Sequence, residues 1–391
     1  MAKRVGIEVS LAVSEAVMLA NVDVIAAYPI TPQTHIVEHL SELVADGHLD
    51  AEFIPVESEH SAMSTCCGSA AAGARTYTAT SSQGQALMLE ICYVASALRL
   101  PIVMSVANRS LSGPISIWND HSDMMMSRDT GWIQTVAENG QEAFDLTLHA
   151  FRVAEDPRVL LPVINNLDGF TLTHVIEPIE MLDQKEVDRY LPPYQPQMRL
   201  DPENPISIGP VGMPEVYTEA KKAQDEAIKS AKPVIIEAWQ EFGDLFGRYY
   251  KPVETYRTDG AETLLVTMGS LSETAMTSVD HMRANGKDVG LVRIRLFRPF
   301  PFEEFLAAVE GAKQIAVMDR ALSLNGAGGP LAIEVKAALY DEPERPYIWN
   351  YVAGLAGRDV TIENFVEMAD GVEAAAADGL RAGYTMINVR E

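Results

Sequence analysis

The stretch Tyr28-Pro29-Ile30-Thr31-Pro32-Gln33-Thr34 decides the fold, because it joins a short apolar run to a helical pattern. Residues 22–27 are apolar and predict a buried strand, which Pro29 ends. Thr31 is then expected to be the N-cap of a helix over 32–45, with Pro32 at its first position. The stretch therefore predicts a strand-to-helix crossing that carries a hydroxyl group.

A second crossing of the same kind follows at Val56-Glu57-Ser58-Glu59-His60, where the polar group is a carboxylate. Strand and helix patterns alternate up to about residue 165, which is typical of an α/β fold with a parallel sheet. The expected strands are 22–27, 52–56, 75–80, 101–107 and 159–164. The expected helices are 9–20, 32–45, 58–73, 84–98 and 140–154. Ligands of such sheets bind at the carboxyl ends of the strands, where both crossings lie.

The second half of the chain has a different organisation. Residues 176–215 are rich in proline without a sustained period, which predicts an extended arm or linker on a surface, where it would suit a role in wrapping a partner. A polar helix is expected from 215 to about 231, followed by a short apolar piece. A second α/β unit opens near 262 with an apolar strand. We therefore predict one domain over 1–240, which includes the arm, and a smaller one over 258–391.

Composition narrows the class of protein. The chain has 391 residues, 47% of them hydrophobic, and a formal net charge of −25. Such an acidic balance argues against nucleic-acid binding, which needs clustered Lys and Arg. No apolar run reaches the roughly 18 residues that a membrane helix requires. The N-terminal residues lack the apolar core of a signal peptide, so we expect a cytoplasmic protein.

The three cysteines are Cys66, Cys67 and Cys92, and none forms a CxxC pair. This spacing predicts neither a disulfide framework nor an iron–sulfur or zinc site. Cys66 and Cys67 are expected to be small packing residues, and we assign no metal ligand in this chain.

Glu59 is the strongest catalytic candidate, although a carboxylate in the first turn of a helix is often only a capping or dipole partner. Ser81-Ser82-Gln83-Gly84 fits either a phosphate cradle or an ordinary turn. The chain has no GxGxxG after its first strand and no GxxxxGK[ST], which disfavours a Rossmann nicotinamide site and a P-loop.

Arg109 directly follows an apolar strand, where a guanidinium suits recognition of a carboxylate or phosphate. A structural ion pair with a nearby acid is the alternative. His121 is expected to be a hydrogen-bonded structural residue rather than a base. Met124, Met125 and Met126 are interpreted as core filling or as the soft wall of a ligand pocket.

Several motifs occur together in one order along nearly the whole chain. They are Tyr28-Pro29-Ile30-Thr31-Pro32, Glu57-Ser58-Glu59-His60, Thr78-Ala79-Thr80-Ser81-Ser82-Gln83-Gly84, Asn108-Arg109, Trp118-Asn119-Asp120-His121-Ser122-Asp123, Arg128-Asp129-Thr130-Gly131-Trp132 and Leu296-Phe297-Arg298-Pro299-Phe300-Pro301. With these motifs the chain resembles the alpha subunit of 2-oxoacid:ferredoxin oxidoreductases, most closely the pyruvate type. The resemblance implies a pyrimidine-type thiamine-diphosphate-binding domain followed by a transketolase-C-terminal-like domain.

The resemblance also implies roles for single residues. Glu59 matches the glutamate that hydrogen-bonds the pyrimidine ring of thiamine diphosphate and favours its imino tautomer. Thr31 and Arg109 match the hydroxyl and the guanidinium that hold the carboxylate and keto oxygens of the substrate. We also assign Pro29, Ser82 and Gln83 to cofactor binding.

The chain lacks the Gly-Asp-Gly pattern, followed by Asn, that holds magnesium and diphosphate in thiamine enzymes; Asp168-Gly169 is the nearest fragment. Partner subunits must therefore complete the cofactor site and carry the electrons. By resemblance they are a beta subunit with the diphosphate site and a [4Fe–4S] cluster, a gamma subunit and a ferredoxin-like delta subunit. CoA is the expected co-substrate and ferredoxin the expected electron acceptor.

The sequence favours pyruvate as the substrate. A dianionic acid such as oxalate would need a second cation, and the chain has Thr31 at that place instead of a second arginine. The loop Ser110-Leu111-Ser112-Gly113-Pro114 has no basic side chain for the distal carboxylate of 2-oxoglutarate. A roomier pocket lined by Met124 to Met126 would instead accept a branched-chain or aryl 2-oxo acid. Two other readings are a different thiamine-dependent half-enzyme, such as a transketolase-like one, and a non-catalytic scaffold subunit.

Overall fold

The first part of the chain builds a seven-stranded sheet in the order β12-β6-β7-β5-β4-β2-β3. The computed structural model describes residues 3–380 and 383–390. Six neighbouring strands of this N-terminal sheet are parallel, as the alternating pattern predicts. They are β2 (Val24–Ala27), β3 (Glu52–Pro55), β4 (Thr76–Thr80), β5 (Ile102–Asn108), β6 (Ile133–Val136) and β7 (Val163–Asp168).

Strand β7 begins four residues later than the strand expected at 159–164. Leu160 has a φ of 44°, in the left-handed region that a strand residue does not adopt. The extended segment therefore starts only after Pro162. This shift places Asp168 at the carboxyl end of the strand.

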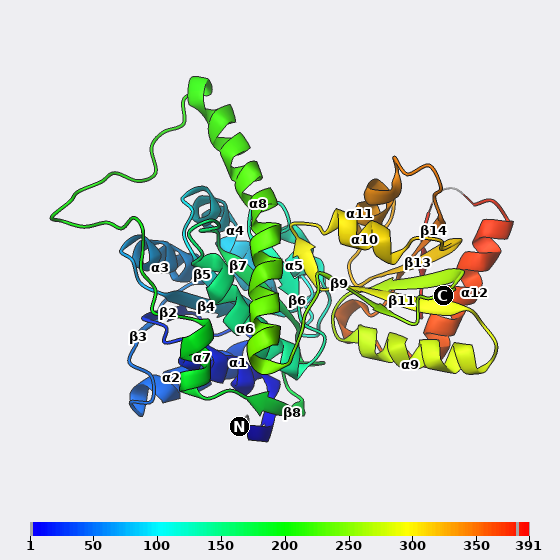
Figure 1. The fold of residues 1–391 in the computed structure, drawn as a ribbon, viewed down its shortest axis with the longest axis horizontal. Coiled ribbons are helices and arrows are strands. Elements are labelled where there is room, and N and C mark those ends of the chain that lie inside the picture. The colour runs from blue at the N-terminus through cyan, green and yellow to red at the C-terminus, as the bar shows by residue number, and fades with distance from the viewer. Residues whose placement is uncertain (1–2, 381–382, 391) are drawn as a thin grey trace.

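Helices cover both faces of the N-terminal sheet (Figure 1). One face packs against α1 (Val9–Leu19), α2 (Thr34–Ala45) and α6 (Gly140–Ala154), whose apolar residues form a single core with those of β4 and β5. The other face packs against α3 (Glu59–Ala71) and α4 (Ser82–Ala97). Because helices cover both faces, every residue of β4, β5 and β7 is buried, polar ones such as Asn165 and Asn166 included.

A second sheet has six strands in the order β15-β14-β13-β10-β11-β9, of which only β9 is antiparallel to its neighbour. Its strands are β9 (Val253–Tyr256), β10 (Thr263–Thr267), β11 (Val289–Ile294), β13 (Gln314–Asp319), β14 (Tyr347–Val352) and β15 (Thr385–Met386). Its helices are α9 (Leu271–Ala284), α10 (Phe302–Ala308), α11 (Pro330–Leu339) and α12 (Ile362–Ala377). We call this sheet with its helices the C-terminal unit.

One strand from the later part of the chain belongs to the N-terminal sheet. Strand β12 (Leu296–Arg298) pairs antiparallel with β6 and forms the edge of that sheet. Figure 1 shows the two sheets side by side, with this edge between them. The two units are therefore joined by main-chain hydrogen bonds, and a division of the chain at residue 258 stays a prediction.

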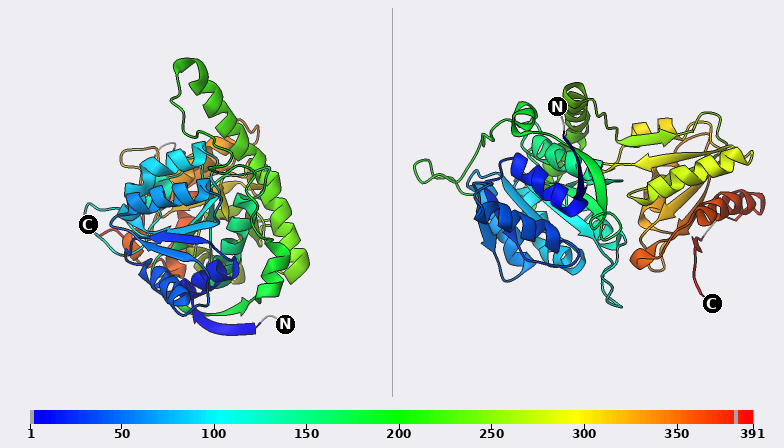
Figure 2. Two further views of the ribbon diagram at one scale, coloured as in Figure 1. Left: turned by 90° about the vertical axis from the view of Figure 1, so that its left-hand side faces the viewer. Right: turned by 90° about the horizontal axis from the view of Figure 1, so that it is seen from below.

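The predicted arm over 176–215 is only partly extended. Its first residues form β8 (Ile176–Met181), which pairs antiparallel with β1 (Lys3–Glu8), and a short helix, α7 (Gln184–Tyr190), follows. The residues of β8 alternate in burial as a strand should, but the proline within it argued against a strand in the sequence. The irregular part is shorter, from about 191 to 213. Its first half contacts the body, as in the bond from the Leu200 N–H to the Ala71 carbonyl, and its exposed second half loops away (Figure 2).

The polar helix predicted up to about residue 231 is longer than expected. Helix α8 (Pro214–Phe246) continues through Pro233, which lies on its exposed side. Val234, Ala238 and Trp239 recur at helical spacing on the other side and pack into the N-terminal core, which offsets the hydrogen bond that proline removes. The beginning of α8 projects from the body in Figure 1. Among the described residues, no helix has both the length and the apolar character to cross a membrane.

Candidate functional site

The carboxyl ends of the parallel strands bring the predicted site residues to one edge of the N-terminal sheet. Thr31 lies in the turn after β2, but it is not an N-cap, because α2 begins at Thr34. Residues 30–33 form a tight turn in which the Gln33 N–H donates to the Ile30 carbonyl over 2.8 Å. The buried Gln33 side chain donates to the carbonyl of Ala79 at 2.7 Å. This link to β4 holds the turn and delays the start of the helix.

Glu59 is the first residue of α3 and is only 5% exposed. The cap of that helix is Ser58, whose hydroxyl accepts from the Ser61 N–H at 3.2 Å. The Glu59 carboxylate makes no side-chain hydrogen bond within residues 3–380 and 383–390. It is therefore not a capping group, and it remains available to a donor from outside the chain.

Gly84 leaves the space that this carboxylate occupies. A Cβ atom at Gly84 would lie 2.7 Å from Glu59 Oε1 and closer still to Thr80 Oγ1. Real Cβ atoms do not approach an oxygen so closely, so a larger residue at 84 would displace Glu59. The glycine of the Ser81-Ser82-Gln83-Gly84 turn thus has a steric role beside the predicted catalytic residue.

Arg109 lies next to Thr31, as the sequence predicts for two ends of nearby parallel strands. Its Nη1 donates to the Thr31 carbonyl at 2.9 Å and its Nε to the Ser116 carbonyl at 2.8 Å. No acidic side chain of the described chain forms an ion pair with it, so the structural ion-pair alternative is wrong. Burial lowers the pKa of Arg109, and the nearby charge of Asp123 opposes this shift. The guanidinium is thus fixed by neutral oxygens and retains an unpaired positive charge.

Ser82 and Gln83 lie beside Glu59 at the start of α4, and both side chains already donate hydrogen bonds inside the chain. The Ser82 hydroxyl donates to the Ser110 carbonyl at 2.6 Å and its N–H to Asp123 at 2.9 Å. Gln83 Nε2 donates to the Ser112 hydroxyl at 2.5 Å. Pro29 is exposed in the turn after β2. Their assignment to cofactor binding stays a prediction.

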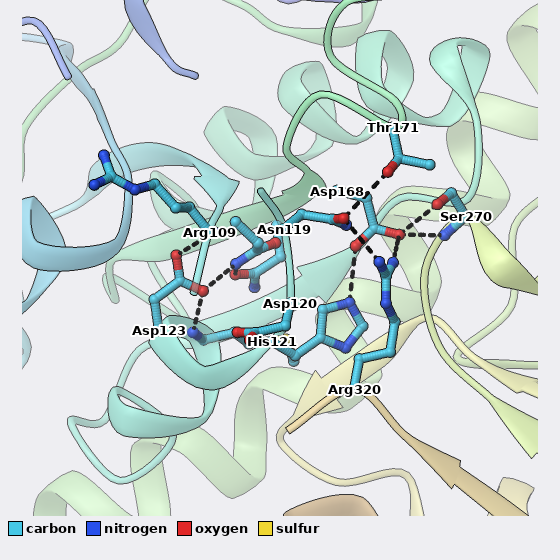
Figure 3. Close-up of polar contacts among 12 residues, drawn as sticks. Arg109, Asn119, Asp120, His121, Asp123, Asp168, Thr171, Ser270 and Arg320 are labelled. Carbon is cyan, nitrogen blue, oxygen red and sulfur yellow. Dashed lines mark hydrogen bonds and ion pairs between the residues drawn. The ribbon is translucent and has the colours of Figure 1, made fainter. Parts of the chain in front are cut away.

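A second polar cluster, centred on Asp168, joins this edge to the C-terminal unit (Figure 3). Asp168 is fully buried. Arg320 Nη1 donates to its Oδ2 at 2.7 Å and His121 Nε2 to its Oδ1 at 2.8 Å. The Ser270 N–H and hydroxyl donate to Oδ2 at 2.8 and 2.5 Å. His121 is thus a buried, hydrogen-bonded residue, as expected.

The partners of Asp168 determine its charge. Burial by itself would raise the pKa of Asp168, but the charges of Arg320 and His121 and the hydrogen bonds from His121 and Ser270 outweigh it. The pKa therefore lies well below its usual range, and the carboxylate stays ionised. Asp168 was not predicted from the sequence as the centre of this cluster; the signal that could have found it is an acid shortly after the predicted strand 159–164.

Asn119 extends the cluster toward the loop that carries Arg109. Its Oδ1 accepts from Arg320 Nη2 at 2.8 Å and from the Thr171 hydroxyl at 3.1 Å. The His121 N–H donates to the Arg320 carbonyl at 2.8 Å. The 119–123 segment is therefore held by the C-terminal unit through side-chain and main-chain contacts.

The methionine run lies in the core rather than in a pocket. Met124 and Met125 are buried among apolar residues of the C-terminal unit, such as Val292 and Phe305. The interpretation of the run as a soft pocket wall is therefore wrong for these two residues. They pack there because β12 brings the C-terminal unit against α5 (Ser122–Met126).

The cysteines behave as packing residues. Cys66 and Cys92 are buried and Cys67 is partly buried. Burial raises the pKa of Cys67 to about 12, so its thiol stays protonated near neutral pH. Among the described residues one group has metal-ligand chemistry, Glu8, His35 and His174, whose ligand atoms all lie within 4.8 Å of one another. In it His35 Nδ1 contacts Glu8 at 2.6 Å, and the two imidazole rings stack.

Comparison with known proteins places the chain in a family. Residues 15–240 match the family described as "Pyruvate flavodoxin/ferredoxin oxidoreductase, thiamine diP-bdg". Residues 261–365 match "Pyruvate:ferredoxin oxidoreductase core domain II". The chain belongs to the pyruvate:ferredoxin oxidoreductase family. The α/β fold class predicted from the sequence is confirmed.

Individual relatives cover most of the chain. The chain is 50% identical to pyruvate synthase subunit PorA of Methanocaldococcus jannaschii, and the match covers 94% of each protein. It is 45% identical to ketoisovalerate oxidoreductase subunit VorA of Pyrococcus abyssi, over 94% of this chain and 93% of that one. A solved 2-oxoglutarate:ferredoxin oxidoreductase from Magnetococcus marinus, with 2-oxoglutarate, coenzyme A and succinyl-CoA bound, shares the fold of this family member at a TM-score of 0.72 and 18% identity. That match covers 95% of this chain and 65% of the solved chain.

Replacement of Arg320 by methionine tests the Asp168 cluster of this family member. The change leaves a buried carboxylate without its cation, which is expected to lower the free energy of unfolding by about 3–5 kcal/mol. Chemical denaturation measures the loss. Arg345→Met, at an exposed position of the same unit, is the control and should leave stability within about 0.5 kcal/mol of the wild type. Equal stability of Arg320→Met and wild type would contradict the assignment.

Proposed function

We propose that this chain is the subunit of a CoA-acylating 2-oxoacid:ferredoxin oxidoreductase that holds the pyrimidine side of thiamine diphosphate and the 2-oxo acid. Glu59 carries the proposal, because it is a nearly buried carboxylate at the ligand edge of a parallel sheet without a partner in the described chain. A buried polar group without a partner is unusual unless a ligand supplies one. Membership of the family supports the choice of ligand.

The residues of the site fit the aminopyrimidine side of this cofactor. Thiamine diphosphate, when bound, supplies the carbon nucleophile and the electron sink for loss of carbon dioxide from a 2-oxo acid. Glu59 would accept a hydrogen bond from a ring nitrogen and hold the proton there. The low exposure of Glu59 strengthens that bond, because little water competes for it.

Arg109 and Thr31 would bind the 2-oxo acid. The Arg109 guanidinium has two donors fixed by carbonyl oxygens, and Nη2 makes no hydrogen bond to a described residue. A carboxylate oxygen suits this remaining donor. Thr31 is exposed beside it, and its hydroxyl would donate to the keto oxygen. The bond between Arg109 and the Thr31 carbonyl fixes the spacing of the two groups.

Pyruvate is the substrate that we propose. The pyruvate synthase subunit of M. jannaschii is 50% identical to this chain. The 45% identity to a ketoisovalerate oxidoreductase subunit keeps a branched-chain acid as the second candidate. The sequence argument for a branched-chain acid was a roomy pocket lined by the methionine run, and it is weakened because Met124 and Met125 pack in the core.

The remaining parts of the enzyme belong to partners in this proposal. A beta subunit would hold the diphosphate with Mg²⁺ and a [4Fe–4S] cluster, gamma and delta subunits would complete the complex, and ferredoxin would accept the electrons. CoA is the co-substrate, and a cytoplasmic location goes with this assignment. Purification of the tagged chain from its host, with identification of the co-purifying chains, tests the composition.

The activity is tested on the complex purified without oxygen. We expect CoA-dependent viologen reduction with pyruvate, and at most weak reduction with 2-oxoisovalerate, phenylpyruvate and 2-oxoglutarate. A preference for 2-oxoisovalerate would favour the second candidate. No turnover of any of these acids, in a complex that contains thiamine diphosphate and clusters, would contradict the proposed function.

Replacement of Glu59 by glutamine should reduce kcat by about 10²–10⁴-fold, because the amide holds a proton less well than the carboxylate. The complex should still assemble. Viologen assays and quantification of bound thiamine diphosphate measure both effects. Glu90→Gln, at an exposed position on α4, is the control. Full activity of the Glu59 variant would favour the scaffold alternative.

Replacement of Arg109 by alanine should act on substrate binding. A charged hydrogen bond contributes about 1.5–3 kcal/mol, so kcat/KM for pyruvate should fall by about 10–100-fold, mainly through KM. Cofactor content should not change, and steady-state kinetics with cofactor quantification measures both. Arg109→Lys, which keeps the charge, should lose less. Loss of bound thiamine diphosphate from Arg109→Ala would overturn the role given to this residue.

A further inference from the structure

A buried carboxylate next to the site, Asp123, has no cationic partner in the described chain. It is fully buried on α5 and accepts four hydrogen bonds. Its Oδ2 accepts from the N–H groups of Ser82 and Arg109, both at 2.9 Å. Its Oδ1 accepts from Asn108 Nδ2 at 2.9 Å and from the Met124 N–H at 2.7 Å. Main-chain and amide donors alone therefore hold the charge.

Three of the four donors, those of Ser82, Asn108 and Arg109, come from segments that carry predicted site residues. Ser82 starts α4, next to Glu59 and Gly84. Asn108 is the last residue of β5, and Arg109 directly follows it. One carboxylate thus links the carboxyl ends of two neighbouring parallel strands. Figure 3 shows Asp123 directly below Arg109, with the cluster around Asp168 farther to the right.

Ser82 has a backbone conformation that needs such support. Its φ is 44°, in the left-handed region that residues with a side chain rarely adopt. Strained residues persist where neighbouring contacts fix them, and they concentrate at functional sites. Two bonds fix Ser82, one from its N–H to Asp123 and one from its hydroxyl to the Ser110 carbonyl.

Asp123 also holds the backbone of Arg109, because its carboxylate accepts a hydrogen bond from the Arg109 N–H. At the other end of the residue, the carbonyl oxygens of Thr31 and Ser116 hold the guanidinium. The segment that carries Asp123 is itself fixed by His121, which binds Asp168 and thereby the C-terminal unit. The position of Arg109 therefore depends on contacts at both ends of the residue.

We propose that Asp123 is a positioning residue of this site, which fixes the backbone of Ser82 and Arg109 so that the guanidinium of Arg109 meets the substrate carboxylate. The proposal deepens the proposed function and rests on it. Asp123 touches neither substrate nor cofactor in this role, and it acts through its two main-chain partners.

Asp123→Asn is the test, because the amide offers one acceptor oxygen where the carboxylate offers two. Its NH₂ group would face N–H donors, so about half of the bonds are lost. In the assembled complex we expect kcat/KM for pyruvate to fall by about 10–100-fold, mostly through KM, since a small misplacement of a binding group has effects of this size. Thiamine diphosphate content should not change. Asp50→Asn, the same change at an exposed position, should match the wild type.

A readout that does not depend on turnover separates this proposal from the proposed function. Hydrogen exchange in Asp123→Asn should be faster over residues 80–86 and 107–113 and unchanged in the C-terminal sheet. If the wild type turned over no 2-oxo acid while exchange changed in these segments, the proposed function would fail and the anchoring by Asp123 would stand. Unchanged exchange in both segments would overturn the positioning role, whatever the activity.

The wild-type complex gives a second measurement, which does not require the variant to fold. Burial raises the pKa of Asp123 to about 6, and the charge of Asp120 acts in the same direction. The hydrogen bonds from the Arg109 and Ser82 N–H groups and from the Asn108 amide lower the pKa but do not outweigh burial. The charged groups that face Asp123 are Asp120 on its own segment and Arg109, directly after β5. Below pH 6 the protonated acid loses acceptor capacity, so kcat/KM should fall.

The contribution of Asp123 to the free energy of unfolding changes in the opposite direction to kcat/KM over this pH range. Because the folded pKa of Asp123 lies above its unfolded value, protonation of this group favours the folded state as the pH falls from 7 to 5. A fall in kcat/KM without loss of thermal stability over this range supports the proposal. A flat kcat/KM between pH 7 and 5 in the wild-type complex would overturn it.

Discussion

The buried carboxylate of Asp168 is the interaction on which the arrangement of both units depends. A charge removed from water is costly unless cations and hydrogen bonds replace its hydration. Here Arg320 and Ser270 come from the C-terminal unit and His121 from the N-terminal unit, so the carboxylate is satisfied only when the units are together. Strand β12, which extends the N-terminal sheet, joins the same units through main-chain bonds. The C-terminal unit is therefore part of the framework of a site that lies on the other sheet.

The charged groups at the ligand edge are not neutralised by one another. Carbonyl oxygens hold Arg109, N–H groups and an amide hold Asp123, and Glu59 has no partner in the described chain. Neutral partners fix a charged side chain in place without cancelling its charge, which leaves that charge available to a ligand. This matters in a chain with a net charge of −25, where an ion pair to Arg109 would be easy to form.

Packing between the units also bears on the substrate. From the sequence, the methionine run favoured core filling but also fitted a pocket wall, since both use flexible apolar side chains. The structure places Met124 and Met125 against the C-terminal unit, which removes the feature that favoured a large 2-oxo acid. The relatives include subunits named for pyruvate and for ketoisovalerate, at 50% and 45% identity to this chain.

The sequence by itself determined the parallel α/β pattern, the strand ends that carry Thr31, Glu59 and Arg109, and the family. These follow from local periodicity and from motifs a few residues long. The tertiary structure alone decided where α2 begins, how far α8 extends, and that β12 joins the first sheet. It also decided which groups hold the site, because Asp123 reaches Ser82 across 41 positions and Arg320 reaches Asp168 across 152. Hydrogen bonds between such distant residues depend on how the elements pack, and a local pattern carries no trace of them.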